Sequence, residues 1–197
     1  MASYARSRRA FAAALVATTA LVGATGLASA ETKEAPALAE AAKHGKLPPA
    51  AERVGAEPEI VRPLKSVGKY GGQLRFGLRG SSDHNNILRM VGPQGLVRWD
   101  PGYQTIIPNV ARSFEASPDA KVFTFHLRKG MRWSDGTPFT ADDVLFNMND
   151  LVLAGGLAPT PPRYMAGGKP VKVEMIDVTS VRFTFEAPFG DFLAELV

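Results

Sequence analysis

The chain has 197 residues, of which 45% are hydrophobic and 21% charged, with 15 Pro, 19 Gly and no Cys. This length suffices for a domain with a hydrophobic core, and the composition excludes both a disordered tail and a disulfide-bonded scaffold. The lack of Cys also excludes Cys-based zinc sites, iron–sulfur clusters and thiol catalysis.

Most of the basic excess, a formal +4, lies in residues 1–30, whose pattern predicts an N-terminal export signal. Residues 1–30 combine three arginines, an uncharged Ala/Leu/Val-rich stretch and a small-residue end, which are the three parts of a cleaved secretory signal. A membrane anchor is the alternative, but Ala, Thr and Gly partition weakly into hydrocarbon. Three of the 23 basic residues precede Glu31, so 20 basic and 19 acidic residues remain. This balance argues against a nucleic-acid partner.

The signal contains features of one particular export route. Ser7–Phe11, with Arg8 and Arg9, resembles the twin-arginine motif, and an ordinary Sec signal that happens to hold two arginines is the alternative. The predicted cleavage site follows Ala28 and Ala30.

Residues 31–69 form a polar, Ala-rich lead-in segment with five prolines. A short helix is predicted over 37–43, and it ends near Gly45. The prolines that follow predict an extended segment lying over a surface, because proline interrupts a continuous helix.

From residue 70 to residue 197 the pattern is that of a folded domain. Residues 71–79 alternate apolar Leu74, Phe76 and Leu78 with polar or small residues, which predicts a strand. A loop dense in hydrogen-bonding side chains follows at 80–86, and a turn is predicted at Trp99–Gly102.

The clearest local structure is a half-buried strand over 122–128. Phe123, Phe125 and Leu127 fall on one face of this strand, and Thr124, His126 and Arg128 on the other. Two turns follow, one at Lys129–Gly130 and one at Ser134–Pro138. The sequence Thr140–Asp143 resembles a capping box at the start of a helix.

The predicted helix has an apolar stripe, which is formed by Val144, Leu145, Met148, Leu151 and Val152. A hairpin is predicted from 171–176 and 181–186, and strands mixed with helices without a βαβ rhythm indicate an α/β fold of the mixed α+β type. At the end of the chain a further amphipathic helix is expected, with Phe189, Phe192, Leu193, Leu196 and Val197 on its apolar face. We expect that face to need partners outside this chain, so the chain is expected to be a fragment.

Several of these stretches resemble one family. Residues 108–114 and 123–144, including Trp133–Pro138, are similar to the signature of the family 5 extracellular solute-binding proteins, the periplasmic receptors of peptide/nickel-type ABC importers. Residues 45–53 and 68–72 resemble the lead-in of a longer subfamily. The resemblance covers most of the chain after residue 44.

The resemblance implies a partial periplasmic-binding-protein type II fold. The chain would hold about the first third of a multi-domain protein, namely the start of the first lobe and much of an accessory subdomain, with the second lobe missing. The ligand of such a receptor sits in a cleft between two lobes. Because relatives bring the ligand near the end of the first strand, the tentative ligand-binding residues are Ser81, Ser82, Asp83 and His84. The alternative is that these side chains only satisfy the hydrogen bonds of their own loop.

Catalysis is disfavoured on geometric grounds. The same loop residues could supply a Ser/His/Asp set, but groups so close in sequence seldom point correctly at one another, and no Gly-x-Ser-x-Gly elbow occurs. No metal site is expected, since His44, His84 and His126 are scattered and the acids at Asp142 and Asp143 suit a helix start. Trp133, Asp135 and Asp142 are interpreted as structural.

The function implied by the resemblance is the substrate-binding component of an ABC importer. It would capture a small solute, most plausibly a peptide, in the periplasm and deliver it to an inner-membrane permease. It would act as a monomer without cofactor or covalent chemistry. The alternatives are an exported sensory or regulatory binding module and a non-functional receptor fragment.

Overall fold

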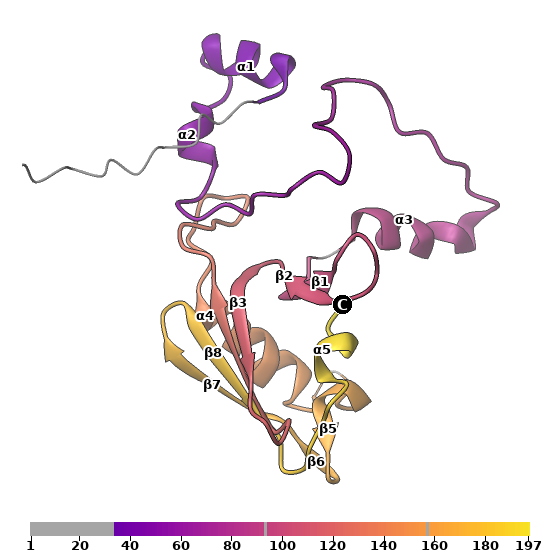
Figure 1. Ribbon diagram of the computed structural model, residues 1–197, viewed down its shortest axis with the longest axis vertical. Coiled ribbons are helices and arrows are strands. Elements are labelled where there is room, and N and C mark those ends of the chain that lie inside the picture. Colours follow the sequence, from indigo (N-terminus) through magenta and orange to yellow (C-terminus); the bar gives the residue numbers. More distant parts are fainter. Residues whose placement is uncertain (1–33, 93, 157) are drawn as a thin grey trace, which may run out of the picture. The chain divides into compact units, whose positions relative to one another are not determined.

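The computed structural model describes residues 34–92, 94–156 and 158–197 (Figure 1). The helical elements are α1 (Pro36–Lys43), α2 (Ala50–Arg53), η1 (Ser81–Asp83), α3 (His84–Val91), α4 (Ala141–Leu145), the π-helical η2 (Phe146–Val152), η3 (Pro162–Tyr164) and α5 (Phe192–Glu195). The strands are β1 (Val97–Trp99), β2 (Ile106–Pro108), β3 (Ala111–Ala116), β4 (Val122–Leu127), β5 (Met165–Ala166), β6 (Lys169–Pro170), β7 (Lys172–Asp177) and β8 (Ser180–Thr184). The predicted export signal, with Ala28 and Ala30, lies outside these ranges.

The architecture is a mixture of helices and antiparallel strands, which confirms the predicted mixed α+β fold. Four strands form one antiparallel sheet in the order β3-β4-β8-β7. Two short hairpins, β1-β2 and β5-β6, lie outside that sheet. Within the described ranges, no helix has the length and apolar character that crossing a membrane requires.

Strand β4 occupies an inner position of the sheet, as its strict alternation predicts. Phe123, Phe125 and Leu127 are buried, while the residues between them are only half-buried. Phe125 lies opposite Phe114 of β3 and Val181 of β8. Because side chains alternate across a strand, one face of β4 faces the core and the other lies toward solvent.

An aromatic cluster fills the space beside the sheet, and Phe192 of α5 lies at its centre. The Phe192 ring centroid is 4.8 Å from that of Phe185 and 4.9 Å from that of Phe123. Phe183 lies 5.5 Å away. The expectation that the apolar face of the C-terminal helix needs outside partners is therefore wrong for Phe192, which is completely buried by this chain's own sheet. The helix is also shorter than predicted, because it begins only at Phe192.

The turn at Ser134–Pro138, here called the signature turn, is followed by α4 and η2, and α4 packs against the sheet. The helical pitch changes between α4 and η2. Met148 is buried as predicted, whereas Leu151, assigned to the same apolar stripe, is exposed. From Phe146 the helix continues as a π-helical turn, which has more residues per turn than an α-helix. A stripe drawn at α-helical spacing therefore places Leu151 on the wrong side.

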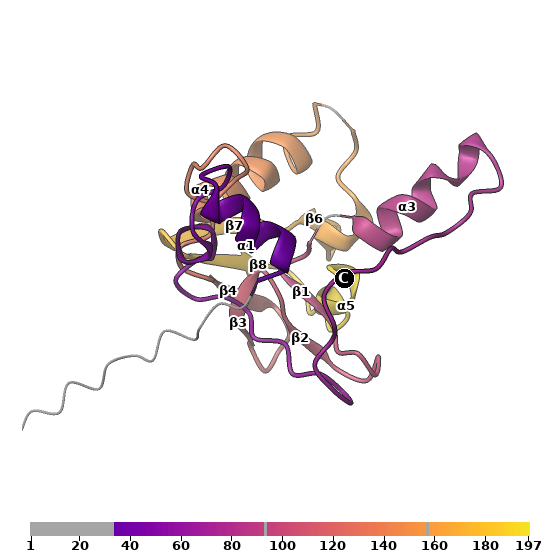
Figure 2. The ribbon, with the colours of Figure 1, turned by 90° about the horizontal axis from the view of Figure 1, so that it is seen from above.

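The strand predicted over 71–79 is absent. Residues 71–78 are extended but belong to no sheet, and the chain from 54 to 80 runs between α2 and α3 as coil (Figures 1 and 2). A strand needs a neighbouring strand for its backbone hydrogen bonds, and among the described residues none lies beside this tract. The predicted loop at 80–86 is also wrong, since it forms η1 and the first turn of α3.

The short helix predicted in the lead-in is present as α1, whereas α2 (Ala50–Arg53) forms one helical turn where an extended segment was predicted. Helix α1 ends at Lys43 and is followed by Gly45 at φ +67°. Further along, the chain lies across the turn after β4. The amide of Glu57 donates to the carbonyl of Lys129 (3.2 Å), and the Glu57 carboxylate accepts from the Lys129 amide (3.1 Å). These two bonds tie the lead-in to the folded domain.

Two glycines allow this close approach. A Cβ on Gly55 would lie 2.9 Å from the carbonyl oxygen of Gly130, and Gly130 itself has φ +79°. A Cβ on Gly130 would lie 2.6 Å from the amide nitrogen of Ala56. Neither the Gly130 carbonyl nor the Ala56 amide can move away without disturbing the turn. The crossing therefore requires Gly55 and Gly130.

We predict that Phe192→Ala lowers the free energy of unfolding by about 3–5 kcal/mol, because it leaves a cavity in the aromatic cluster. Phe146→Ala is the matched control and changes it by less than about 0.5 kcal/mol, since Phe146 is largely exposed. Urea unfolding measures both. Equal losses from the two variants would contradict the assigned core.

We predict that Gly55→Ala destabilises the crossing by about 1–3 kcal/mol, because the added methyl group overlaps the Gly130 carbonyl. Gly68→Ala is the control, since nothing lies within 4 Å of its added methyl group. Amide exchange at Glu57 and Lys129 reports the effect directly. Unchanged exchange in Gly55→Ala would show that the crossing does not form.

Candidate functional site

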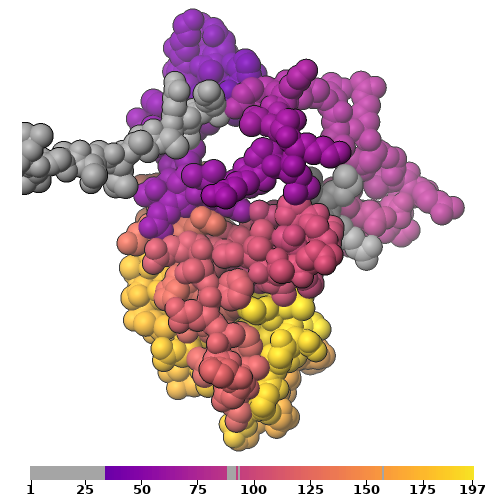
Figure 3. Space-filling view, viewed as in Figure 1, coloured from indigo at the N-terminus to yellow at the C-terminus, as the bar shows by residue number. Residues whose placement is uncertain are grey.

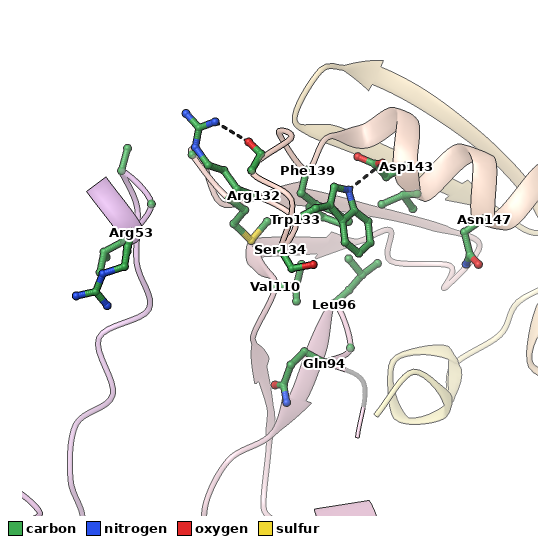
Figure 4. A pocket seen from close by; sticks show the side chains of 18 of the residues that line it. Arg53, Gln94, Leu96, Val110, Arg132, Trp133, Ser134, Phe139, Asp143 and Asn147 are labelled. Carbon is green, nitrogen blue, oxygen red and sulfur yellow. Dashed lines mark hydrogen bonds between the residues drawn. The ribbon is translucent and has the colours of Figure 1, made fainter. Parts of the chain in front are cut away.

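The signature turn and the start of α4 are joined by one carboxylate. The indole Nε1 of Trp133 donates to Asp143 Oδ1 (3.1 Å; Figure 4). The Thr140 amide donates to Asp143 Oδ2 (2.7 Å). Thr140 Oγ1 in turn accepts from the Asp142 amide (3.3 Å), which completes the predicted capping box. Asp143 thereby fixes the indole relative to the helix.

The turn itself is held by Asp135. Its Oδ1 accepts from the amide (2.9 Å) and the hydroxyl (2.7 Å) of Thr137, and these bonds lower the pKa of the Asp135 carboxyl. Gly136 has φ +91°, a conformation that glycine adopts without strain. These contacts fit the structural interpretation of Asp135 and Trp133.

An open hollow of about 1800 Å³ lies beside this turn. Its lining combines apolar and polar side chains, including those of Leu96, Val110, Phe139, Trp133, Asp143 and Asn147 (Figure 4). Pockets for small molecules usually enclose about 300–1,000 Å³. The hollow is larger and open to solvent, so these residues alone do not enclose a small solute.

The four residues predicted to bind ligand lie elsewhere. Ser81, Ser82 and Asp83 form η1, and His84 begins α3. The described lining of the hollow includes none of them. All four are exposed or half-buried on a single short stretch of chain.

The side chains of Asp83 and His84 are engaged locally. Asp83 Oδ2 accepts from the Arg79 amide (2.7 Å) and Oδ1 from Asn86 (3.3 Å). His84 Nδ1 lies 3.0 Å from the carbonyl of Ser81 rather than from a hydroxyl, so the contact needed by a nucleophile and its base is not made. A ligand role for these residues stays a prediction.

A second polar cluster lies on the outer face of the sheet. His126 Nδ1 is 2.9 Å from Oγ of the buried Ser180. Bonds from Thr179 and Ser180 lower the pKa of the Asp177 carboxyl. This arrangement agrees with the expectation that His126 lies on the polar face of its strand. No group of three or more potential metal ligands occurs among the residues that the structure describes.

The sequence did not predict that Asp143 accepts a hydrogen bond from the Trp133 indole, and it did not predict the hollow. The capping box pointed to the acids of the first helical turn, but only the fold brings Trp133 to one of them. The spacing of ten residues between Trp133 and Asp143 carries no local signal, because the intervening turn decides their distance.

The sequence and the fold match known proteins. Residues 105–197 match the family described as bacterial extracellular solute-binding proteins, family 5 Middle. The periplasmic alpha-galactoside-binding protein of Rhizobium meliloti (strain 1021) is 34% identical over 170 residues, which are 75% of this chain and 24% of the relative.

Two solved structures share the fold over most of the chain. An oligopeptide-binding protein OppA matches with a TM-score of 0.74 and 38% identity, over 83% of this chain and 25% of that protein. The periplasmic binding protein MelB from Agrobacterium fabrum C58, solved in complex with stachyose, matches with a TM-score of 0.56 and 26% identity, over 85% and 29% of the two chains.

Residues 105–197 match the model of the family 5 bacterial extracellular solute-binding proteins, the family that the resemblance predicted. Members of this family are solute-binding receptors. The mixed α/β fold is accordingly part of a periplasmic-binding-protein fold. The chain spans about a quarter of the length of these relatives, less than the predicted third.

We predict that Asp143→Ala lowers the free energy of unfolding by about 0.5–2 kcal/mol, because it removes the acceptor of the Thr140 amide and so half of the capping box. It also shifts the emission of Trp133, whose indole loses its acceptor. The adjacent Asp142→Ala keeps both bonds of Asp143 and serves as the control. Identical emission changes in the two variants would contradict the assigned bond.

Proposed function

We propose that this chain is part of the exported substrate-binding component of an ABC importer. The protein captures a small solute in the periplasm and delivers it to a permease in the inner membrane. The observation that carries the proposal is the family 5 match over residues 105–197, together with the fold similarity to an oligopeptide-binding protein. The part described here acts as scaffold and as one side of a binding surface.

The mechanism is binding coupled to lobe closure. A solute that contacts both lobes stabilises the closed conformation, and the permease responds to that population. No covalent step or cofactor is required. We assign Ser81, Ser82, Asp83 and His84 to the cleft on this chain's side, because they follow the extended tract and present several donors and acceptors within one exposed turn.

A peptide is the proposed solute. Of the relatives reported above, the oligopeptide-binding protein has the highest identity and TM-score. An α-galactoside is the second candidate. The relative from Rhizobium meliloti matches 75% of this chain, and the stachyose-bound MelB matches 85% of it.

Native mass spectrometry of the protein purified from its own host distinguishes these solutes. Peptides give heterogeneous masses, whereas α-galactosides differ by whole hexose units. Bound peptides support the first proposal, and bound oligosaccharides support the second. A protein that carries neither, and that neither class stabilises against heat, contradicts both.

We predict that the 197-residue chain alone shows no thermal shift with oligopeptides or with stachyose. Its hollow is open, and its candidate residues lie on one side only. A complete site at 100-fold excess over Kd would add about 2.7 kcal/mol, which raises Tm by several degrees. Such a shift in the chain alone would contradict the need for a second lobe.

A further inference from the structure

The signature turn contains the only Asp-Gly dipeptide of the sequence, Asp135–Gly136, and no asparagine precedes a glycine. Aspartate before glycine is prone to rearrangement, because glycine has no side chain to hinder attack by its own amide nitrogen. In that reaction the nitrogen of Gly136 forms a bond to Cγ of Asp135, and one water leaves to give a five-membered imide ring. Water then reopens the ring at Cγ, which restores aspartate, or at the backbone carbonyl carbon, which gives isoaspartate.

The rearrangement needs no other reactant and alters the backbone. One water leaves when the ring closes and one enters when it opens, so isoaspartate has the mass of aspartate. In isoaspartate the chain runs through Cβ and Cγ, and the backbone is therefore one carbon atom longer. The turn between Trp133 and Asp143 fixes their hydrogen bond, so a longer backbone at residue 135 displaces the indole from its acceptor.

Solvent reaches this dipeptide in the structure. The lead-in, purple in Figure 3, lies against the neighbouring turn at Lys129–Gly130. Residues 132–138, by contrast, are all exposed. Burial therefore does not protect Asp135 and Gly136 from water, and any protection comes from the hydrogen bonds of the turn.

The attacking nitrogen is held by the backbone of the turn. The Gly136 amide donates to the Trp133 carbonyl (2.9 Å), and the Trp133 amide donates to the Thr137 carbonyl (2.8 Å). The Arg132 guanidinium donates to the Gly136 carbonyl (2.9 Å). Ring closure requires that the Gly136 nitrogen lose its proton and approach Cγ of Asp135. The reaction therefore breaks the bond from Gly136 to Trp133.

The carboxylate that would be attacked is held by Thr137. Asp135 Oδ1 accepts from both the amide (2.9 Å) and the hydroxyl (2.7 Å) of that residue. Because these bonds favour the ionised carboxylate, they hold the pKa of Asp135 below its usual range. The imide forms from the protonated carboxyl group, since its hydroxyl can leave as water. Both bonds from Thr137 therefore oppose ring closure.

We propose that Asp135–Gly136 is a modification site at which isoaspartate forms when the signature turn opens, and that Thr137 suppresses the reaction while the turn is closed. A chain that stays unfolded, or whose turn opens locally, is modified there and does not rebuild the bond between Trp133 and Asp143. The site is separate from the candidate ligand residues Ser81–His84. The inference depends on neither the solute nor the permease.

Incubation in heavy-oxygen water measures the reaction, because every opening of the imide places one oxygen atom from the solvent in residue 135. The 197-residue chain is compared with a peptide of residues 131–141, and mass spectrometry of proteolytic fragments follows the label. We expect the peptide to take up label about 100-fold faster than the folded chain, because ring closure in the fold breaks three hydrogen bonds. Equal rates in the two, or a peptide that takes up no label, would overturn the proposal.

Substitutions at residue 137 isolate the hydroxyl. Thr137→Val removes it but keeps the amide and the shape of the side chain, and should speed labelling of the folded chain about 5–10-fold. In the peptide the same change should have no effect. Thr137→Ser keeps a hydroxyl and should label at the original rate, as should the matched control Ser134→Ala in the same exposed turn. No acceleration in Thr137→Val, or equal acceleration in Ser134→Ala, would overturn the role of Thr137.

Two further measurements separate opening of the turn from unfolding of the domain. Amide exchange at Phe125 and Phe183 reports on the sheet, and Thr137→Val should leave it unchanged because residue 137 is exposed. Faster labelling accompanied by equally faster exchange at these two amides would overturn opening of the turn alone. Chains that contain isoaspartate, separated by chromatography, should show the emission change predicted for Asp143→Ala. Unchanged emission would contradict the expected loss of the turn.

Discussion

The contact between Phe192 and the two inner strands is the interaction on which the described fold depends. Phe123 on β4, Phe183 on β8 and Phe185 directly after β8 present aromatic rings to one face of the sheet, and Phe192 of α5 closes that face. The sheet and the closing residue both lie between Ala111, where β3 begins, and Phe192. This unit has a complete aromatic core, and it can position the signature turn and the start of α4.

Features set by near neighbours were predictable from the sequence. The alternation at 122–127, the glycine turns and the capping box at Thr140 each depend on residues within one turn or one strand, and all three are present. The exposure of Leu151 was not predictable, because helical spacing gives no sign that the pitch changes at Phe146. The burial of Phe192 depends on the nearby β8 and also on Phe123 of β4, which is far away in sequence.

The tract at 71–79 shows most clearly where prediction from the sequence pattern fails. Its alternation describes the environment a strand requires, whereas a strand forms only where another edge exists to pair with it. The candidate residues Ser81–His84 share this limitation, since a side chain contributes to a cleft only when the opposite wall is present. The Trp133–Asp143 bond, by contrast, lies wholly within the folded unit, yet only the three-dimensional turn reveals it.

In the proposed receptor, scaffold and recognition are separate: the sheet and the turn at Ser134–Pro138 supply rigidity, and exposed segments meet the rest of the protein. A crystal structure of the protein from its own host with its solute tests this division most directly. The account predicts that the four-stranded sheet is unchanged and that η1 contacts the solute. A solute enclosed by residues of this chain alone would contradict it.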